Sequence, residues 1–214
     1  MSYNTHFFDN VGFMLADLPK DIFADIKTRC ADILANPDQA TAANTTLAGA
    51  IEKEYFVDGL QDKLEPYLIW LSNEYDNHFH YTHTVDRMDI GHRKWQFSLD
   101  SVWANFQRKH EFNPVHNHGG TLSFVIWVQI PYDLEAEFKN SREHNDYPKT
   151  TSCFQFLVIN TMGQIYNHTL PVDRSWEGKI MIFPAKMMHT VYPFYTSDDY
   201  RISVAGNVTK KILE

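Results

Sequence analysis

Cysteine is scarce in this sequence, and long apolar runs are absent. The 214 residues include only Cys30 and Cys153, which lie far apart in segments with a helical and a strand pattern. A disulfide framework is therefore not expected. We expect two buried thiols instead, in a protein of a reducing, cytoplasmic compartment. No charge-free apolar run reaches about 18 residues, and the first twenty residues lack the basic and apolar regions of a signal peptide. The sequence predicts neither secretion nor a membrane span.

Basic residues are also few. Lysine and arginine number 19 against 27 acidic residues, which gives a formal charge of -8. A broad phosphate-binding surface needs the opposite balance, so nucleic acid is not an expected partner, although a local basic patch remains compatible with this average. The chain is 43% hydrophobic and 14% aromatic, enough for a sizeable core, and its length favours a single domain over residues 1–214.

The first part of the chain, residues 1–93, has a mainly helical pattern. Apolar residues recur every three to four positions over residues 18–34, with Pro19 at the start and Asn36-Pro37 at the end. A second helical pattern covers residues 60–75, where Pro66 either kinks the helix or marks its first turn. We therefore expect two amphipathic helices here.

Residues 94–208 have the period-two pattern of strands instead. Strand-like runs occupy residues 95–99, 102–106, 121–130, 154–159, 179–183, 189–194 and 202–208. Thr161-Met162-Gly163 suggests a hairpin, and residues 139–149 form a charged connection typical of a surface loop. Helices followed by many strands predict an α+β, mainly β fold in which the helices cover one face of a sandwich or barrel.

Two histidines stand directly before the strand pattern of residues 121–130. His116 and His118 are two residues apart, so on extended backbone both imidazoles point the same way and could reach one metal ion. The glycines that follow them keep the approach to that ion open. In a chain with eleven histidines such a pair also arises by chance, and two exposed polar residues are the alternative interpretation.

Three later residues sharpen this pattern. His189, 71 residues after His118, opens a late strand and could complete a three-ligand site across a barrel. Arg201 and Ser203 alternate onto one face of the next strand, where a guanidinium fork and a hydroxyl could hold a carboxylate. Taken singly, these residues are more typical of other roles: His189 of a hydrogen-bonded histidine at a strand end, Arg201 of a surface salt bridge and Ser203 of an ordinary strand serine.

In this order, His116-x-His118, His189 and Arg201-x-Ser203 resemble the His-x-Asp/Glu, distal His and Arg-x-Ser pattern of the 2-oxoglutarate/Fe(II) dioxygenases. The runs Asn-Pro-x-His-x-His-x-Gly and Gly-x-x-x-x-Phe-Pro-x-x-x-x-His are similar to oxygenases of tailed marine bacteriophages. The similarity covers roughly residues 95–208, with a fainter part at residues 47–55. It implies a double-stranded β-helix, a jelly-roll or cupin-like barrel, with His116 and His189 as iron ligands and Arg201 and Ser203 holding the distal carboxylate of 2-oxoglutarate.

The sequence departs from this pattern at His118, where the superfamily has an acidic ligand. His118 could be the third ligand, a carboxylate elsewhere could replace it, or the site could have lost or changed its activity; the first is favoured because His118 shares the orientation of His116. Asn105, on the preceding strand, is a candidate polar contact to the co-substrate. A second histidine group at His78, His80 and His83 is better explained as a solvated helix end than as a metal cluster.

The resemblance implies Fe(II) as cofactor, with 2-oxoglutarate and O2 as co-substrates. 2-Oxoglutarate would be converted to succinate and CO2 while a C–H bond of a primary substrate is hydroxylated. Two alternatives remain: a cupin-like metal dioxygenase that does not use 2-oxoglutarate, and a non-catalytic, phage-associated barrel protein. No motif identifies the primary substrate, and pairing of two copies through the helices or edge strands is one option for the oligomeric state.

Overall fold

Two antiparallel sheets form the body of the molecule. The computed structural model describes residues 11–84, 93–142 and 149–213. The six-stranded major sheet has the order β1-β8-β5-β10-β3-β2, and the four-stranded minor sheet has the order β4-β9-β6-β7. The major-sheet strands are β1 (Met14–Asp17), β2 (Glu54–Phe56), β3 (Trp95–Gln107), β5 (Leu122–Gln129), β8 (Lys179–Pro184) and β10 (Arg201–Ile212). The minor-sheet strands are β4 (Asn113–His116), β6 (Phe154–Ile159), β7 (Ile165–Leu170) and β9 (His189–Val191).

Strand β5 shows why the two sheets face each other. Its residues are buried from Leu122 to Val128, because the strand is covered on both sides. Ile126 belongs to the apolar cluster under the helices, whereas its neighbours Val125 and Trp127 belong to a second cluster that includes Phe154 of the minor sheet. The alternation of side chains along one strand therefore fills two cores.

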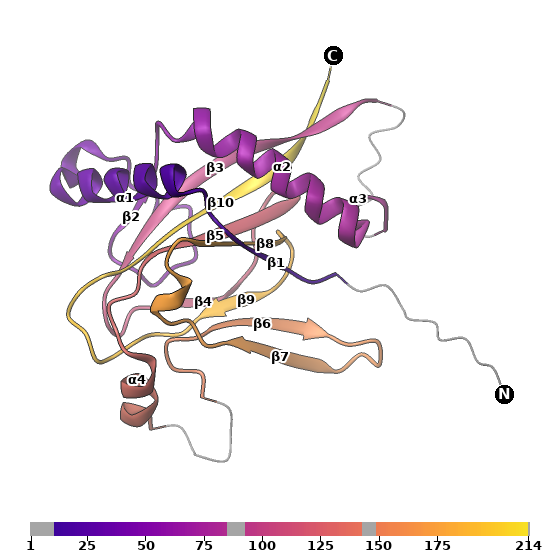
Figure 1. Cartoon of the computed structure of the whole chain (residues 1–214). Helices are drawn as coiled ribbons and strands as arrows, with labels where there is room; N and C mark the ends of the chain where they lie inside the picture. Colours follow the sequence, from indigo (N-terminus) through magenta and orange to yellow (C-terminus); the bar gives the residue numbers. More distant parts are fainter. Residues whose placement is uncertain (1–10, 85–92, 143–148, 214) are drawn as a thin grey trace.

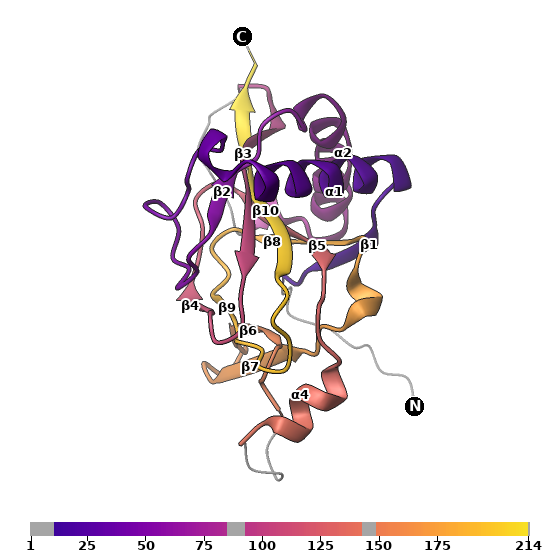
Figure 2. The same cartoon turned by 90° about the vertical axis from the view of Figure 1, so that its left-hand side faces the viewer.

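The helices cover the outer face of the major sheet, as predicted. Figures 1 and 2 show α1 (Lys20–Ala35) and α2 (Gln61–Phe79) on the side of the major sheet away from β6 and β7. Each helix buries a single apolar stripe, Ile22, Ile26 and Cys30 on α1 and Leu64, Leu68, Leu71 and Tyr75 on α2. Helix α2 is followed by the short α3 (Tyr81–Thr84), and two 3-10 turns occur at Pro37–Gln39 and Arg174–Trp176.

Several boundaries differ from the predicted ones. Pro66 lies inside α2, which begins at Gln61, so this proline does not mark the first turn. The charged connection of residues 139–149 begins in a helix, α4 (Leu134–Asn140), whose first turn is capped by the Asp133 carboxylate. Residues 143–148 of that connection lie outside the described residues. The two predicted runs at residues 95–106 form one strand, β3, which pairs along its length with β10.

Strands β1 and β2 were not predicted. Each has only three or four residues and depends on a neighbour, since β1 pairs with β8 and β2 with β3. The expected hairpin is confirmed at β6–β7. The arrangement is the expected mainly β double-stranded β-helix with helices on one face, although the hydrogen-bonded strands described form two sheets and not one closed ring.

Both cysteines are buried and neither forms a disulfide, as predicted. Cys30 lies in the cluster under the helices, and Cys153 directly precedes β6 of the minor sheet. None of the helices within the described residues is long and apolar enough to cross a membrane.

Candidate active site

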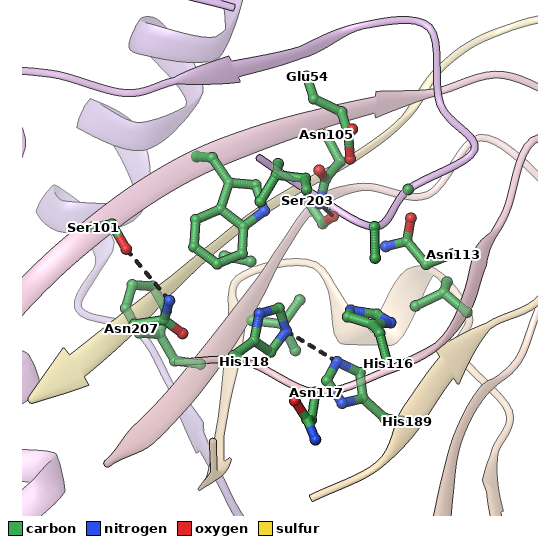
Figure 3. A pocket seen from close by; sticks show the side chains of 18 of the residues that line it. Glu54, Ser101, Asn105, Asn113, His116, Asn117, His118, His189, Ser203 and Asn207 are labelled. Atoms are coloured by element: carbon green, nitrogen blue, oxygen red, sulfur yellow. Dashed lines mark hydrogen bonds between the residues drawn. The ribbon is translucent and has the colours of Figure 1, made fainter. Parts of the chain in front are cut away.

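Three histidines from two strand ends and a loop converge between the sheets (Figure 3). His116 ends β4 and His189 begins β9, and these two residues face each other in the register of the minor sheet. His118 lies two residues beyond β4, in the loop that leads to β5. The Nε2 atoms of His118 and His189 are 3.2 Å apart, and one ring nitrogen from each of the three residues lies within 4.8 Å of the others. Two nitrogens bound to one ion lie roughly 3 Å apart, so this spacing fits a shared metal.

Backbone carbonyls fix the orientation of two of these rings. His116 Nδ1 lies 2.7 Å from the carbonyl oxygen of Pro114, and His189 Nδ1 lies 2.9 Å from that of Met187. Because a carbonyl only accepts hydrogen bonds, each Nδ1 carries the proton and each Nε2 presents a lone pair. Metal-binding histidines are usually held in this way.

Burial keeps the three imidazoles neutral. It lowers the pKa of His116, lowers that of His118 to about 4 and lowers that of His189 to about 3, with the neighbouring histidines adding to the effect at His118 and His189. A neutral imidazole is the form that binds a metal. The site therefore needs no proton release from these side chains near neutral pH.

Within the described residues, no carboxylate joins the three histidines. The residues present fit a divalent transition metal such as Fe(II), Zn(II) or Ni(II), for which imidazole is a suitable ligand. They supply three neutral donors, so the protein side of the site leaves the full charge of the ion uncompensated. His118 thus lies where the superfamily pattern has its acidic ligand.

Arg201 is, like His189, almost fully buried. The side chain is 4% exposed, and its five N–H groups point to neutral acceptors: the Gln107 amide oxygen, the Tyr132 hydroxyl and the carbonyls of Ser152 and Tyr192. No carboxylate of the described residues lies within ion-pair distance of it. A buried guanidinium without a counter-ion is costly, so the site favours an anionic ligand.

A cavity of about 400 Å³ contacts the histidines, and a narrow pocket beside it, the extension, borders Arg201. Ser203 and Asn105 line both spaces. They are paired in the register of β10 and β3, and the Asn105 amide donates to the Ser203 hydroxyl at 3.4 Å. All six predicted site residues therefore border one or both of these two adjoining spaces. The extension measures only about 20 Å³, so a dicarboxylate would enter it by displacing side chains such as Gln107.

Several residues of the site were not predicted. Gln107 and Tyr132 hold the Arg201 guanidinium, and Trp103 packs its ring 5.4 Å from that of His118. Glu54 and Asn113 line the cavity beside Asn105. Asn113 could have been found, since it opens the motif that contains His116, whereas Glu54 belongs to a strand too short to be recognised. His78, His80 and His83 form no metal-like group among the residues described.

The chain is similar to oxygenases at the level of sequence pattern and fold. Residues 101–207 match the sequence model of the family described as "Putative 2OG-Fe(II) oxygenase". No curated protein sequence matches the chain at a significant level.

Solved structures share the fold at low sequence identity. A prolyl-4-hydroxylase from Pseudomonas putida is 14% identical over 94% of both chains, with a TM-score of 0.57. AviO1 from Streptomyces viridochromogenes is 12% identical over 92% of this chain and 89% of its own, with a TM-score of 0.55. A Trichoplax adhaerens prolyl hydroxylase, solved with a peptide of the hypoxia inducible factor, is 8% identical over 93% and 83%, with a TM-score of 0.50.

The match to the family model covers half of the 214 residues and includes the histidine pair, His189, Arg201 and Ser203. Together with the shared fold, it confirms the predicted enzyme class and the predicted use of Fe(II) and 2-oxoglutarate. The chain belongs to the 2-oxoglutarate/Fe(II) oxygenase family.

Proposed function

We propose that His116, His118 and His189 hold the Fe(II) of this oxygenase and that Arg201, with Ser203, holds the distal carboxylate of 2-oxoglutarate. The observation that carries this assignment is a cavity lined by three convergent imidazoles, next to a pocket that borders a buried guanidinium lacking a carboxylate partner among the described residues. Bound there, iron supplies the oxidising chemistry that converts 2-oxoglutarate to succinate and CO2 while a substrate C–H bond is hydroxylated.

The protein's own groups bind, orient and exclude water. The Pro114 and Met187 carbonyls keep the proton on Nδ1 of His116 and His189, so that both Nε2 atoms face the cavity. The Gln107 amide oxygen accepts from Nε and Nη2 of Arg201, and an entering carboxylate would replace it, because an ionised acceptor binds a guanidinium more strongly than a neutral one.

Charge supports the use of a dianion in a site without an acidic ligand. Three neutral imidazoles leave the ion with a charge of +2, which a dianionic co-substrate offsets. His118 is therefore proposed as the third ligand in place of a carboxylate.

A cupin-like metal dioxygenase that does not use 2-oxoglutarate is the second candidate, and the three-histidine ligand set is the observation that favours it. The two candidates differ at Arg201. If the enzyme uses 2-oxoglutarate, replacing Arg201 weakens the binding of this co-substrate. If it does not, replacing Arg201 leaves ligand and metal binding unchanged.

The test is anaerobic Fe(II) binding followed by addition of 2-oxoglutarate. The expected result is a weak visible charge-transfer band of the chelated complex in the wild type, and its loss in His189→Ala. Bound iron without that band would favour the second candidate. Failure to retain iron would favour a non-catalytic barrel protein.

We further propose that the chain is related to oxygenases of tailed marine bacteriophages and acts in the host cytoplasm as one domain over residues 1–214. The support is sequence alone: the two histidine-containing runs and the paucity of cysteine. A small-molecule or peptide primary substrate fits the acidic average charge better than nucleic acid. We also propose that two copies of the chain form a homodimer. Light scattering tests this directly, because it measures the molecular mass in solution.

A further inference from the structure

A buried glutamate borders the cavity, on the side of β2 and β3, away from the proposed iron ligands (Figure 3). Glu54 begins β2, lies opposite Asn105 on β3, and is 1% exposed. Its Oε2 atom is buried without a hydrogen-bond partner among the described residues. Glu54 is the only acidic side chain among the described residues that line this cavity.

The chain passes close over this carboxyl group. A Cβ atom added at Gly49 would collide with the Glu54 carboxylate and with the Asn113 amide oxygen. Residues 46–49 also line the cavity, so the loop encloses Glu54 from the side opposite β3. This enclosure excludes water, which would otherwise solvate the carboxylate.

The unsatisfied atoms around Glu54 are all hydrogen-bond acceptors. Besides Glu54 Oε2, they are Oδ1 of Asn105 and Oδ1 of Asn113, and all three residues line the cavity. An amide can turn and present its NH2 group, but an ionised carboxylate can only accept. 2-Oxoglutarate brings acceptors only, so any ligand donor to Glu54 has to come from a second molecule.

Aromatic side chains also line this cavity. Phe56 follows Glu54 by two residues on β2 and lines the same cavity, as does Trp103 of β3. The faces of such rings attract cations. Burial, and next the charge of Glu111, raise the pKa of Glu54 to about 7, and a cationic ligand would oppose both effects.

From these contacts we infer that Glu54 binds a cationic nitrogen, an alkylammonium group, of the primary substrate. The substrate class is therefore an amine that places its charged end at β2 and a C–H bond at the histidines. This inference rests on the proposed function for the reaction at that C–H bond, but the binding of an amine can be measured without turnover.

The experiment uses full-length protein loaded anaerobically with Fe(II) and 2-oxoglutarate, with n-butylammonium as probe and n-butanol as its neutral counterpart. Calorimetry or ligand-observed NMR gives both affinities. We expect the wild type to bind the ammonium about tenfold or more tightly than the alcohol, and Glu54→Gln to lose that preference. Glu52→Gln, which removes an exposed carboxylate two residues away, is the matched control and should keep the preference.

Equal affinities for the two probes in the wild type, or an unchanged preference in Glu54→Gln, would overturn the inference. If Glu54→Gln does not fold, the wild-type ratio of the two affinities decides alone. The charge-transfer band is recorded on the same samples. A band without amine preference contradicts only the role of Glu54, whereas bound iron without a band contradicts the proposed function.

Discussion

At the scale of single residues, two buried side chains of opposite charge border the site, each without a counter-ion among the described residues. Glu54 lies under the loop of residues 46–49, and Arg201 lies in the narrow extension. Each is unfavourable in the unliganded protein and becomes favourable when the complementary group binds. Ligand binding thus offsets the unfavourable free energy of burying these two side chains.

Glu54 makes the stability of the unliganded protein depend on pH. Its pKa is about 7 in the folded chain and about 4.5 in the unfolded chain, so the folded state binds more protons between these values. The free energy of unfolding therefore falls as the pH rises from about 4.5 to about 7. We expect Glu54→Gln to be more stable than the wild type by about 1–3 kcal/mol at pH 8, and the difference to shrink towards pH 4. Urea unfolding across this range measures it, and a difference independent of pH would show that ionisation of Glu54 is not its cause.

His118 tests the proposed ligand set. Replacing it with alanine removes one of three donors, and we expect Fe(II) affinity to fall by about 100-fold or more. His118→Asp should retain most of the affinity, because a carboxylate is a good ligand for the same ion. Competition with a chelator gives the affinities, and His78→Ala, on the exposed side of α2, is the control. Undiminished affinity in His118→Ala would exclude this residue as a ligand.

Arg201→Lys separates co-substrate binding from metal binding. Lysine keeps the charge but loses the planar fork whose five N–H groups reach four neighbours. We expect 2-oxoglutarate to bind about 10- to 100-fold more weakly, with Fe(II) affinity unchanged. Titration of the charge-transfer band measures the first quantity. An unchanged affinity for 2-oxoglutarate would argue for the cupin-like candidate.

At the scale of elements, β10 organises the site because it pairs with both β3 and β5. It carries Arg201 and Ser203 at one end, and Gly206 near its middle. A Cβ atom at Gly206 would collide with the Ser101 carbonyl oxygen and the Phe124 ring. The close approach of three strands at this point therefore requires glycine.

We expect Gly206→Ala to destabilise the fold by about 1–3 kcal/mol, the usual cost of forcing extra volume into a packed interior. Gly119→Ala is the control, since an added Cβ there meets nothing within 4 Å. Denaturant unfolding of both variants gives the two free energies. Equal stabilities would show that β10 can shift away from Ser101 at little cost.

Long elements were predictable from the sequence, and short ones were not. Strand β5 is recognised from a continuous apolar run, and α1 from its apolar stripe. Strands β1 and β2 carry no periodic signal of their own, because pairing with β8 and β3 forms them. Tertiary contacts of this kind are invisible to a local pattern.

The candidate site was likewise predictable only in part. His116, His118, His189 and Arg201 were recognised because their order resembles that of the oxygenase pattern, and strand periodicity added that Arg201 and Ser203 share a face. His118 joins the cluster from a loop beyond β4, where periodicity no longer applies, and Glu54 enters from β2. The enclosure of Glu54 by residues 46–49 depends on how the chain returns over β3, which only the folded structure reveals.

At the scale of the whole molecule, two apolar clusters share the major sheet. One lies between this sheet and the helices, and the other lies between the two sheets, next to the cavity. The proposed ligands all bind in the second layer. Occupancy of the cavity should therefore stabilise the contact between the sheets more than the contact between the sheet and the helices.

The two buried thiols can report on these layers separately. Cys30 lies under the helices, and burial raises its pKa to about 12, so a thiol reagent reaches it only when that layer opens. Cys153 lies between Ser152, whose carbonyl accepts from Arg201, and Phe154, which lines the cavity. In Cys30→Ala and Cys153→Ala single-thiol variants, we expect Fe(II) with 2-oxoglutarate to slow labelling of Cys153 at least tenfold and that of Cys30 less. Equal slowing would mean that the two layers open together. Unequal slowing would mean that they open independently, and the labelling rate of each thiol would then measure how often its own layer opens.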